Sequence, residues 1–485
     1  MNSVSSEKKA ALGANSELSF DQLLGQLLPK VIQGFVSLDG VERLSAGASQ
    51  ETYCIQVTLK SGPEKLAMRR ASGGEEGEIT AQHPGLAVEA LLMQTAAKYG
   101  VPEPEIHHVL TPADGLGSGF IMQWLEGLTL GARIVKAPEL DQIRPKLAYL
   151  CGEILARIHA IDLKVSGLDQ HLQLLTPREY VEQTWQRYQE FNTPQPMIDY
   201  TARWLLANLP ENFTPALVHN DFRNGNVMVD ETGVVAVLDW EVAHIGDPMR
   251  DLGWMLTHSW RFGRAELPVG GFGETEDLFA GYESISGKKV DPQAVKFWQV
   301  FGSFWWAVGC LGMAEHYRTG PDQSVERPAI GRRSSECQVD CVNLLIPGPV
   351  ELVQADESAV GIDMPGIDEL LASVTDFLRQ DVMSSTQGRT NFLARVASNS
   401  LDIVQREVAL GQACLVNESQ RLRTLFASDE LVNDLRWRLT HGLRDESIGL
   451  DFPGLADHLR ATVVNQIAID QPRYAGFATA TKVLS

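Results

Sequence analysis

The feature that most constrains the fold of this chain is a polar loop near its middle, LVHNDFRNGNVMVD at residues 217–230. The loop packs one His, three Asn, two Asp, one Arg and one Gly between short apolar runs. The segment VAVLDW at 235–240 follows after the turn DETG, so two short strands joined by a turn are predicted. A carboxylate at Asp221 and an amide at Asn226 therefore lie five residues apart on a loop that its neighbours mark as buried.

Strand patterns are concentrated in the first part of the chain. The segment 51–59, ETYCIQVTL, alternates apolar and polar residues, and 65–70, KLAMRR, follows a Ser-Gly-Pro turn, which predicts a hairpin. An amphipathic helix is predicted at 19–35, a second at 85–100, and another strand at 120–127. We therefore expect a small sheet with helices up to about residue 130.

Helical periodicity dominates from about residue 140 onward. The stretch 347–366 is rich in Pro, Gly and acidic residues without periodicity, as a linker is. Beyond it the pattern is only helical. Because 485 residues exceed what one core usually supports, more than one domain is expected. The predicted parts are a disordered N-terminus at 1–18, a mixed domain at 19–346, a linker at 347–365 and a helical domain at 366–485.

Charge and composition narrow the function classes. With 41 basic and 62 acidic residues the net charge is −21, which disfavours nucleic-acid and membrane-surface partners. An anionic substrate would need local cations. The start of the chain has no apolar stretch of signal-peptide length, so a cytoplasmic protein is expected. Of the six cysteines only Cys337 and Cys341 lie close together, and we interpret them as core residues.

The polar loop and the strand after it carry the residue types that phosphoryl transfer from ATP requires. Asp221 can accept a hydroxyl proton, whereas the amide of Asn226 and the carboxylate of Asp239 offer the oxygen ligands that Mg²⁺ prefers. The bland interpretations are an Asx turn for the Asp–Asn pair and a satisfied core histidine for His219.

Three motifs resemble one known family. HNDFRNGN, LDWE and GDPMRDL are similar to the aminoglycoside phosphotransferase and choline kinase branch of the kinase-like superfamily, over about residues 20–345. The resemblance implies an α+β, bilobal protein-kinase-like fold with a β-rich N-lobe at about 19–127 and a helical C-lobe at about 128–346. An all-α domain would follow this fold.

The resemblance also assigns roles. It implies Asp221 as the catalytic base, Asn226 and Asp239 as Mg²⁺ ligands, His219 as a loop-positioning residue and Asp251 as the support of the loop. Around ATP it implies the phosphate-covering turn LSAGASQETY, an ion pair between a basic and an acidic residue, and a hinge whose backbone meets adenine. The residues in these positions are Gly47, Ser49, Thr52, Arg69, Glu89, Gln123 and Trp124.

One of these positions departs from the usual pattern. Arg69 stands where the family has Lys, and arginine can bind phosphate or carboxylate through two nitrogens. Glu89 alone is compatible with a solvated helix face. The joint order of all these residues along the chain favours the phosphotransferase interpretation.

The expected function is therefore an ATP- and Mg²⁺-dependent kinase for a hydroxyl of a small molecule. Arg223, Arg261 and Arg264 would bind an anionic acceptor, and nearby aromatic residues, Trp254, Trp260 and Phe262, suit an acyl chain. Similar sequences occur fused to acyl-CoA dehydrogenases, which implies a hydroxy acid or hydroxyacyl-CoA.

Two questions stay open from the sequence. The alternative function is a regulator that binds a nucleotide or acyl-CoA without catalysis. The tail resembles a bacterial domain of unknown function, and its helices predict a salt-bridged interface, a lid or a homodimer contact. We expect the helices of the tail to bury a core of their own.

Overall fold

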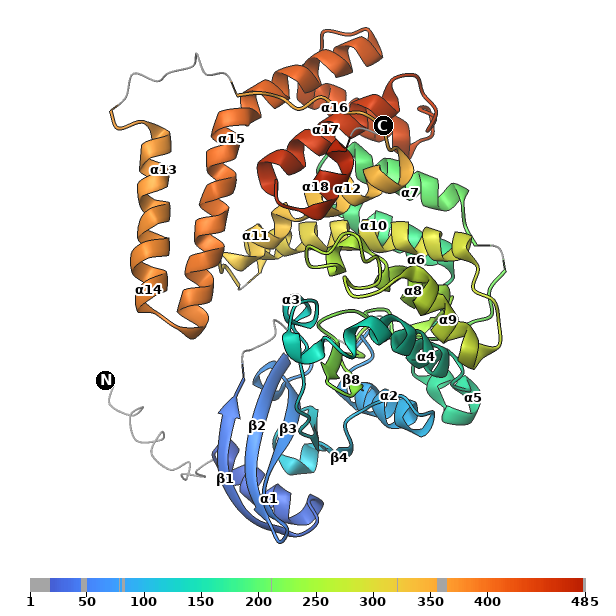
Figure 1. Ribbon diagram of the computed structural model, residues 1–485, viewed down its shortest axis with the longest axis vertical. Helices are drawn as coiled ribbons and strands as arrows, with labels where there is room; N and C mark the ends of the chain where they lie inside the picture. Colours follow the sequence, from blue (N-terminus) through green and yellow to red (C-terminus); the bar gives the residue numbers. More distant parts are fainter. Residues whose placement is uncertain are drawn as a thin grey trace, which may run out of the picture. The chain divides into compact units, whose positions relative to one another are not determined.

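A computed structural model describes residues 18–44, 50–77, 79–80, 83–210, 212–320, 322–355 and 364–482. The chain divides into two compact units, each of which is described by itself (Figure 1). The first comprises the described residues of Met1–Lys98, Pro102–Glu126 and Asp239–Val242. The second comprises Tyr99–Val101, Gly127–Leu238 and Ala243–Ser485.

The first unit is an antiparallel five-stranded sheet in the order β1-β2-β3-β5-β4. Helix α1 begins after a capping box of Ser19 and Gln22, and its apolar face packs Leu24 and Leu28 against strand residues such as Ile55. The elements are α1 (Phe20–Val31), β1 (Phe35–Arg43), β2 (Gln50–Leu59), β3 (Gly62–Ala71), α2 (Leu86–Lys98), β4 (Ile106–Val109) and β5 (Gly119–Gln123).

Strands β1 and β4 were not predicted from the sequence. Both lie at the edges of the sheet, and the residues of each are mostly half-buried or exposed, so neither shows a clear apolar alternation. The predicted hairpin is present as β2 and β3, and its register places Thr52 opposite Arg69.

The second unit is mainly helical and has two short two-stranded sheets, β6 with β9 and β7 with β8. Its strands are β6 (Ala216–Val218), β7 (Val227–Asp230), β8 (Gly233–Val237) and β9 (His244–Gly246). Its longer helices up to residue 345 are α4 (Leu147–His159), α6 (Pro177–Glu190), α7 (Pro196–Ala207), α8 (Met249–Met255), α9 (Thr275–Ser286), α10 (Pro292–Thr319), α11 (Glu326–Arg332) and α12 (Ser334–Leu345).

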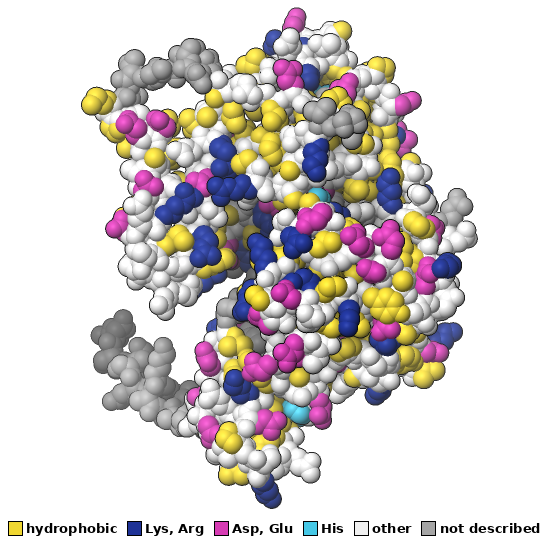
Figure 2. All heavy atoms as spheres, in the orientation of Figure 1, with side chains coloured by type: hydrophobic (Ala, Val, Ile, Leu, Met, Phe, Trp, Pro, Cys, Tyr) yellow, Lys and Arg dark blue, Asp and Glu magenta, His cyan; other side chains and the backbone are white. Residues whose placement is uncertain are grey.

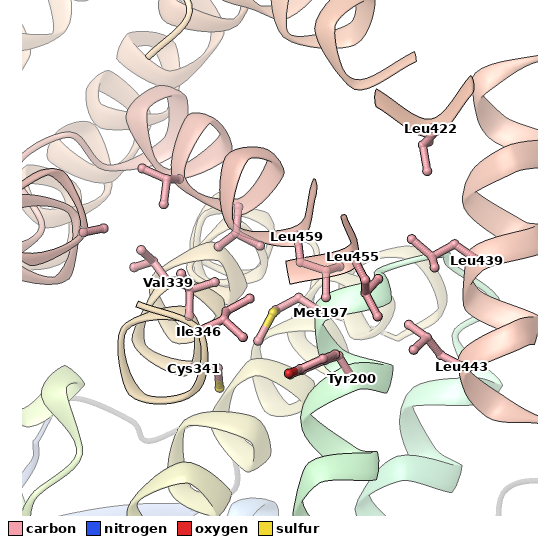
Figure 3. Close-up of a cluster of buried hydrophobic side chains, with 14 of the residues drawn as sticks. Met197, Tyr200, Val339, Cys341, Ile346, Leu422, Leu439, Leu443, Leu455 and Leu459 are labelled. Atoms are coloured by element: carbon pink, nitrogen blue, oxygen red, sulfur yellow. The ribbon is translucent and has the colours of Figure 1, made fainter. Parts of the chain in front are cut away.

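The helical tail consists of α13 (Ile367–Asp376), α14 (Met383–Ser385), α15 (Gly388–Phe426), α16 (Val432–Arg444), α17 (Leu455–Asp470) and α18 (Ala475–Thr481). Its core is shared with the preceding helices. Figure 3 shows Met197 and Tyr200 of α7 and Val339 of α12 in one cluster with Leu439 and Leu459 of the tail. The expectation that the tail buries a core of its own is therefore wrong, because α7 and α12 supply one wall of it.

Polar contacts reinforce this shared core. Arg444 of α16 donates to the buried carboxylate of Asp199 on α7 at 2.8 Å. The expected linker also packs in part, since the Val353 amide donates to Asn465 of α17 at 2.7 Å. The described half of that segment is thus bound to the tail.

Helices α13 and α15 lie side by side as a hairpin (Figure 1). Ile367, Leu370, Val374 and Phe377 recur at helical spacing on it and are each at least half exposed. Figure 2 shows Lys and Arg side chains gathered beside this hairpin, although the chain is anionic as a whole. The homodimer expected through the tail stays a prediction.

None of the described helices combines the length and apolarity that crossing a membrane requires.

Candidate functional site

The polar loop lies between β6 and β7, and a buried carboxylate at the start of α8 holds its backbone. Asp251 is fully buried and accepts from the backbone amides of His219 at 2.8 Å and Asn220 at 2.7 Å. Asn220 has a φ of 71°, a conformation that Asn tolerates better than most residues. Burial raises the pKa of Asp251, but the hydrogen bond from His159 and the charges of His159 and His219 lower it by more, so this carboxylate stays ionised.

The side chain of His219 contacts the backbone on both sides of its ring. Its Nδ1 accepts from the Asp221 amide at 3.2 Å, and its Nε2 lies 3.2 Å from the carbonyl oxygen of Leu238. The Leu238 amide in turn donates to the carbonyl of Asn226 at 2.7 Å. These contacts position the loop against the end of β8, and none of them involves the Asp221 carboxylate.

The carboxylate of Asp221 accepts four hydrogen bonds. Trp254 Nε1 and Arg223 Nε both lie 2.9 Å from Oδ1. Arg223 Nη2 lies 3.1 Å and Asn226 Nδ2 2.5 Å from Oδ2. Such donors orient the carboxylate. Both oxygens of Asp221 are thus engaged by other side chains.

Asn226 contacts Asp221 through its amide nitrogen, which also donates to the Asp221 carbonyl at 3.0 Å. The amide oxygen is not used in these contacts, and it is the atom that a hard cation binds. The loop thus presents a carboxylate and a carbonyl oxygen in a fixed arrangement.

Aromatic side chains pack beside Asp221. The Arg223 guanidinium lies 4.3 Å from the centre of the Trp260 ring, and the rings of Trp254 and Trp260 are 5.0 Å apart. Trp305 and Trp306 of α10 extend this cluster, at 5.3 Å from Trp254 and 5.9 Å from Trp260 respectively. Trp254 and Trp260 were predicted from the sequence to lie near the acceptor, whereas Trp305 and Trp306 were not.

Arg250 was also missed. Its guanidinium is fully buried over the rings of Trp254 and Phe301, at 4.7 and 5.3 Å. Burial lowers the pKa of Arg250, and Tyr180, Asp251 and Asp221 oppose that change. The motif GDPMRDL contained this residue, and its position next to Asp251 was the available signal.

Two arginines that were expected to meet an acceptor have other partners. Arg261 donates to the carbonyls of Ala265 and Leu256, both at 3.0 Å, and Arg264 donates to Glu266 at 2.6 Å. The expectation for this pair is corrected, because their nitrogens stabilise the loop that follows α8. Of the three cations, Arg223 is the one beside Asp221.

In the first unit, three carboxylates surround Arg69. Its Nη2 lies 2.5 Å from Asp239 Oδ1 and 3.8 Å from Glu241, and its Nε lies 3.3 Å from Glu89. Glu89 is 1% exposed, so the interpretation as a solvated helix face is wrong. Arg69 also donates to Gln50. The expected pairing of Arg69 with Glu89 is present, and Asp239 is an additional partner.

The charges in this cluster do not balance. Burial raises the pKa of Glu89 to about 7, with Arg69 lowering it and Asp239 and Glu241 raising it. Burial lowers the pKa of Arg69, but the three carboxylates raise it by more, so Arg69 stays charged. One guanidinium thus faces up to three negative charges.

This excess of negative charge and the oxygen donors of Asp239 suit a divalent cation. Within the described ranges, no three or more His, Cys, Asp or Glu side chains are grouped so that they could hold a metal ion. The expected pair of Asn226 and Asp239 is of a different kind, since one of its ligands is an amide.

The remaining residues predicted to contact the nucleotide differ in where the structure places them. Gly47 and Ser49 lie outside the described residues. Thr52 stands opposite Arg69 in the sheet. The amide of Gln123 donates to the Glu105 carbonyl at 2.8 Å, so this group is engaged within the sheet edge and is not free for adenine. The side chain of Trp124 donates to Glu126 at 2.8 Å, which leaves its backbone as the candidate contact.

Comparison with known proteins gives two family matches. Residues 40–287 match the model of the phosphotransferase enzyme family. Residues 384–474 match a domain of unknown function (DUF6285).

The curated relatives are longer proteins. Acyl-CoA dehydrogenase family member 10 of Mus musculus is 28% identical over 219 residues, which are 43% of this chain and 19% of that protein. Family member 11 of Gallus gallus is 28% identical over 242 residues, 49% of this chain and 30% of that protein. The chain thus spans less than a third of the length of these two relatives.

A solved structure shows the same fold. It is a protein of Ralstonia eutropha provisionally described as an aminoglycoside phosphotransferase, with a TM-score of 0.54 and 22% identity. The match covers 66% of this chain and 95% of that protein. The predicted α+β, kinase-like fold followed by a helical region is confirmed.

Proposed function

The chain belongs to the phosphotransferase enzyme family, and from this premise we propose that it uses ATP and Mg²⁺ to phosphorylate a hydroxyl group of a small molecule. The observation that carries the proposal is the pair of Asp221 and Asn226. Asn226 Nδ2 lies 2.5 Å from Asp221 Oδ2, and the backbone amide of His219 on the same loop donates to Asp251. Asp221 would accept the proton of the attacking hydroxyl.

The metal would be held by Asn226 through its amide oxygen and by Asp239. Mg²⁺, when bound, supplies positive charge that offsets the charge on the phosphate oxygens. The cluster around Arg69 supports this assignment, since its carboxylates outnumber its single guanidinium. A cation bound to Asp239 would compete with Arg69 for this carboxylate. The guanidinium of Arg69 would then be able to bind phosphate.

For the acceptor we propose a hydroxy acid or a hydroxyacyl-CoA. The support comes from Arg223, which now binds the base Asp221 and stacks on Trp260 at 4.3 Å. A carboxylate or phosphate on the acceptor would give this guanidinium a second partner, so that Asp221 is freed when the acceptor binds. The apolar rings beside it suit an acyl chain, and the curated relatives carry the name acyl-CoA dehydrogenase.

The second candidate is a regulator that binds a nucleotide or acyl-CoA without turnover. Two observations favour it: Arg69 is engaged by Asp239, and Asp221 is engaged by four donors. In an active enzyme, the cation would compete with Arg69 for Asp239, and the acceptor would compete with Asp221 for Arg223.

One experiment separates the two candidates. The purified chain is given MgATP and a panel that contains hydroxy acids, hydroxyacyl-CoA thioesters, choline and kanamycin, and ADP release is followed. We expect the hydroxylated acids to stimulate ADP release in the wild type and not in Asp221→Asn. Stimulation by choline or kanamycin alone would refute the acceptor class, and nucleotide binding without any stimulated turnover would support the regulator.

A further inference from the structure

The tail reaches a buried carboxylate of the second unit near the catalytic loop. Tyr474, the residue before α18, donates its hydroxyl to Asp340 Oδ2 on α12 at 2.7 Å. Asp340 is 2% exposed. A Cβ atom on Gly476 would lie 2.6 Å from Asp340 Oδ1, so the start of α18 packs as closely on this carboxylate as a residue without a side chain allows.

The other oxygen of Asp340 faces the segment that follows α8. His258 Nδ1 lies 3.8 Å from Asp340 Oδ1, and the His258 ring is 5.6 Å from the Tyr474 ring. Within the described part of the chain, Asp340 Oδ1 and His258 Nε2 have no hydrogen-bond partner. Burial and then Arg261 lower the pKa of His258 to about 3, so the ring is neutral and packs here without forming an ion pair.

Arg261 brings the charge that this carboxylate faces. It lies in the same segment and closes it by donating to Leu256 and Ala265. Burial lowers the pKa of Arg261, whereas Asp340 and Tyr474 oppose that change. Burial raises the pKa of Asp340 and Glu336 adds to the rise, whereas the hydrogen bond from Tyr474 and the charge of Arg261 oppose it. Residues 256–265 are thus closed by the hydrogen bonds of Arg261 and pack against Asp340 of α12 at His258.

The same segment contacts the catalytic loop through Trp260. Asn224 donates to the Trp260 carbonyl at 3.2 Å, and the Trp260 ring stacks on Arg223 at 4.3 Å. Arg223 holds Asp221 through two nitrogens. A series of contacts therefore runs from the tail to the proposed base. It passes from Tyr474 to Asp340, from Asp340 to His258, along the turn His258–Trp260, and from Trp260 through Arg223 to Asp221.

We propose that Tyr474 and Asp340 are positioning residues, through which the helical tail holds Trp260 and Arg223 in place on the acceptor side of the catalytic loop. This inference rests on the proposed function, because the acceptor side is defined by the role of Asp221. It assigns a task to the region that matches a domain of unknown function. Neither residue contacts Asp221, so their effect passes through the segment 256–265.

The test uses the full-length chain with two changes at this junction. Tyr474→Phe removes the hydroxyl and keeps the ring, and Gly476→Ala pushes α18 away from Asp340. The matched control is Tyr200→Phe, which removes the hydroxyl of another buried tyrosine of the shared core (Figure 3). Hydrogen–deuterium exchange of residues 256–265 is measured first, since it needs no activity.

We expect exchange in 256–265 to rise about threefold or more in Tyr474→Phe and Gly476→Ala, and to stay at the wild-type rate in Tyr200→Phe. With an active wild type, KM for the acceptor should rise by about threefold or more at Tyr474→Phe while kcat and the affinity for MgATP change little.

Hydrogen–deuterium exchange tests this inference, whereas phosphotransferase activity of the wild type tests the proposed function. Unchanged exchange in both variants, or an equal rise in Tyr200→Phe, overturns the inference whatever the activity. An active wild type in which Tyr474→Phe leaves KM unchanged, or lowers kcat alone, overturns it as well. A wild type without phosphotransferase activity refutes the proposed function, and with it the acceptor-side role, even where the exchange result shows the physical link.

Discussion

The guanidinium of Arg223 holds both carboxylate oxygens of Asp221, with nitrogen–oxygen distances of 2.9 and 3.1 Å. The two residues are separated by a single position on the same loop, so the contact needs no long-range motion to form or break. An incoming anionic group could compete with Asp221 for this guanidinium. Under the proposed function, a negative charge on the acceptor would give Arg223 this other partner.

Arg223→Lys should separate charge from geometry. Lysine keeps the positive charge but cannot bind a carboxylate through two fixed nitrogens. We expect KM for an anionic acceptor to rise on the order of tenfold, with the affinity for MgATP unchanged. Arg264→Lys is the control, because Arg264 pairs with Glu266. An effect of the same size in the control would remove the special role of Arg223.

Asp221→Asn should keep the shape of the loop and remove proton acceptance. Turnover should fall on the order of a hundredfold or more, while calorimetry gives nearly normal MgATP affinity. Near-normal turnover in this variant would exclude Asp221 as the base.

Asp239→Ala should abolish Mg²⁺-dependent nucleotide binding, since it removes an oxygen ligand and leaves phosphate charge uncompensated. The change also deprives Arg69 of its 2.5 Å partner. The control is Glu64→Ala, which removes an exposed carboxylate of β3 in the same unit. Titration calorimetry with and without Mg²⁺ measures the effect, and unchanged MgATP affinity in Asp239→Ala would contradict the assignment.

Glu89 should make the first unit less stable as the pH rises. Its pKa is about 7 in the folded chain against a usual value of 4.5. Between pH 4.5 and pH 7, Glu89 is therefore protonated in the folded chain and ionised in the unfolded chain. The resulting stability is complete below about pH 4.5 and is lost as the pH rises through 7. Glu89→Gln cannot titrate. Thermal denaturation of both chains from pH 5 to pH 8 should therefore show a smaller fall in the variant, and parallel curves would contradict this.

Removing the tail should damage the rest of the second unit. A chain that ends at Gly348 would expose Met197, Tyr200, Val339 and Ile346, which now pack against tail helices. It would also leave Asp199 without Arg444. We expect an insoluble or molten product, judged by near-ultraviolet circular dichroism and sedimentation. A cooperative, soluble fragment would show that α7 and α12 pack stably alone.

The sequence by itself determined the fold class, the family and the grouping of Asp221, Asn226 and Arg223. The family and the kinase-like fold class follow from the resemblance of three motifs. Strand alternation and helical spacing locate most elements, and the loop is too short to separate the three side chains. Edge strands β1 and β4 escaped prediction because half-exposed strands need no apolar alternation.

Only the tertiary structure decided which partner each charged side chain has. Arg69 meets Asp239 across 170 positions, Arg261 turns to the carbonyls of its own loop, and Tyr474 reaches Asp340 across 134 positions. The shared core of α7, α12 and the tail is of the same kind. A charged or apolar side chain has many equivalent partners along a sequence, and burial selects among them only when distant segments pack and each buried polar group must be satisfied.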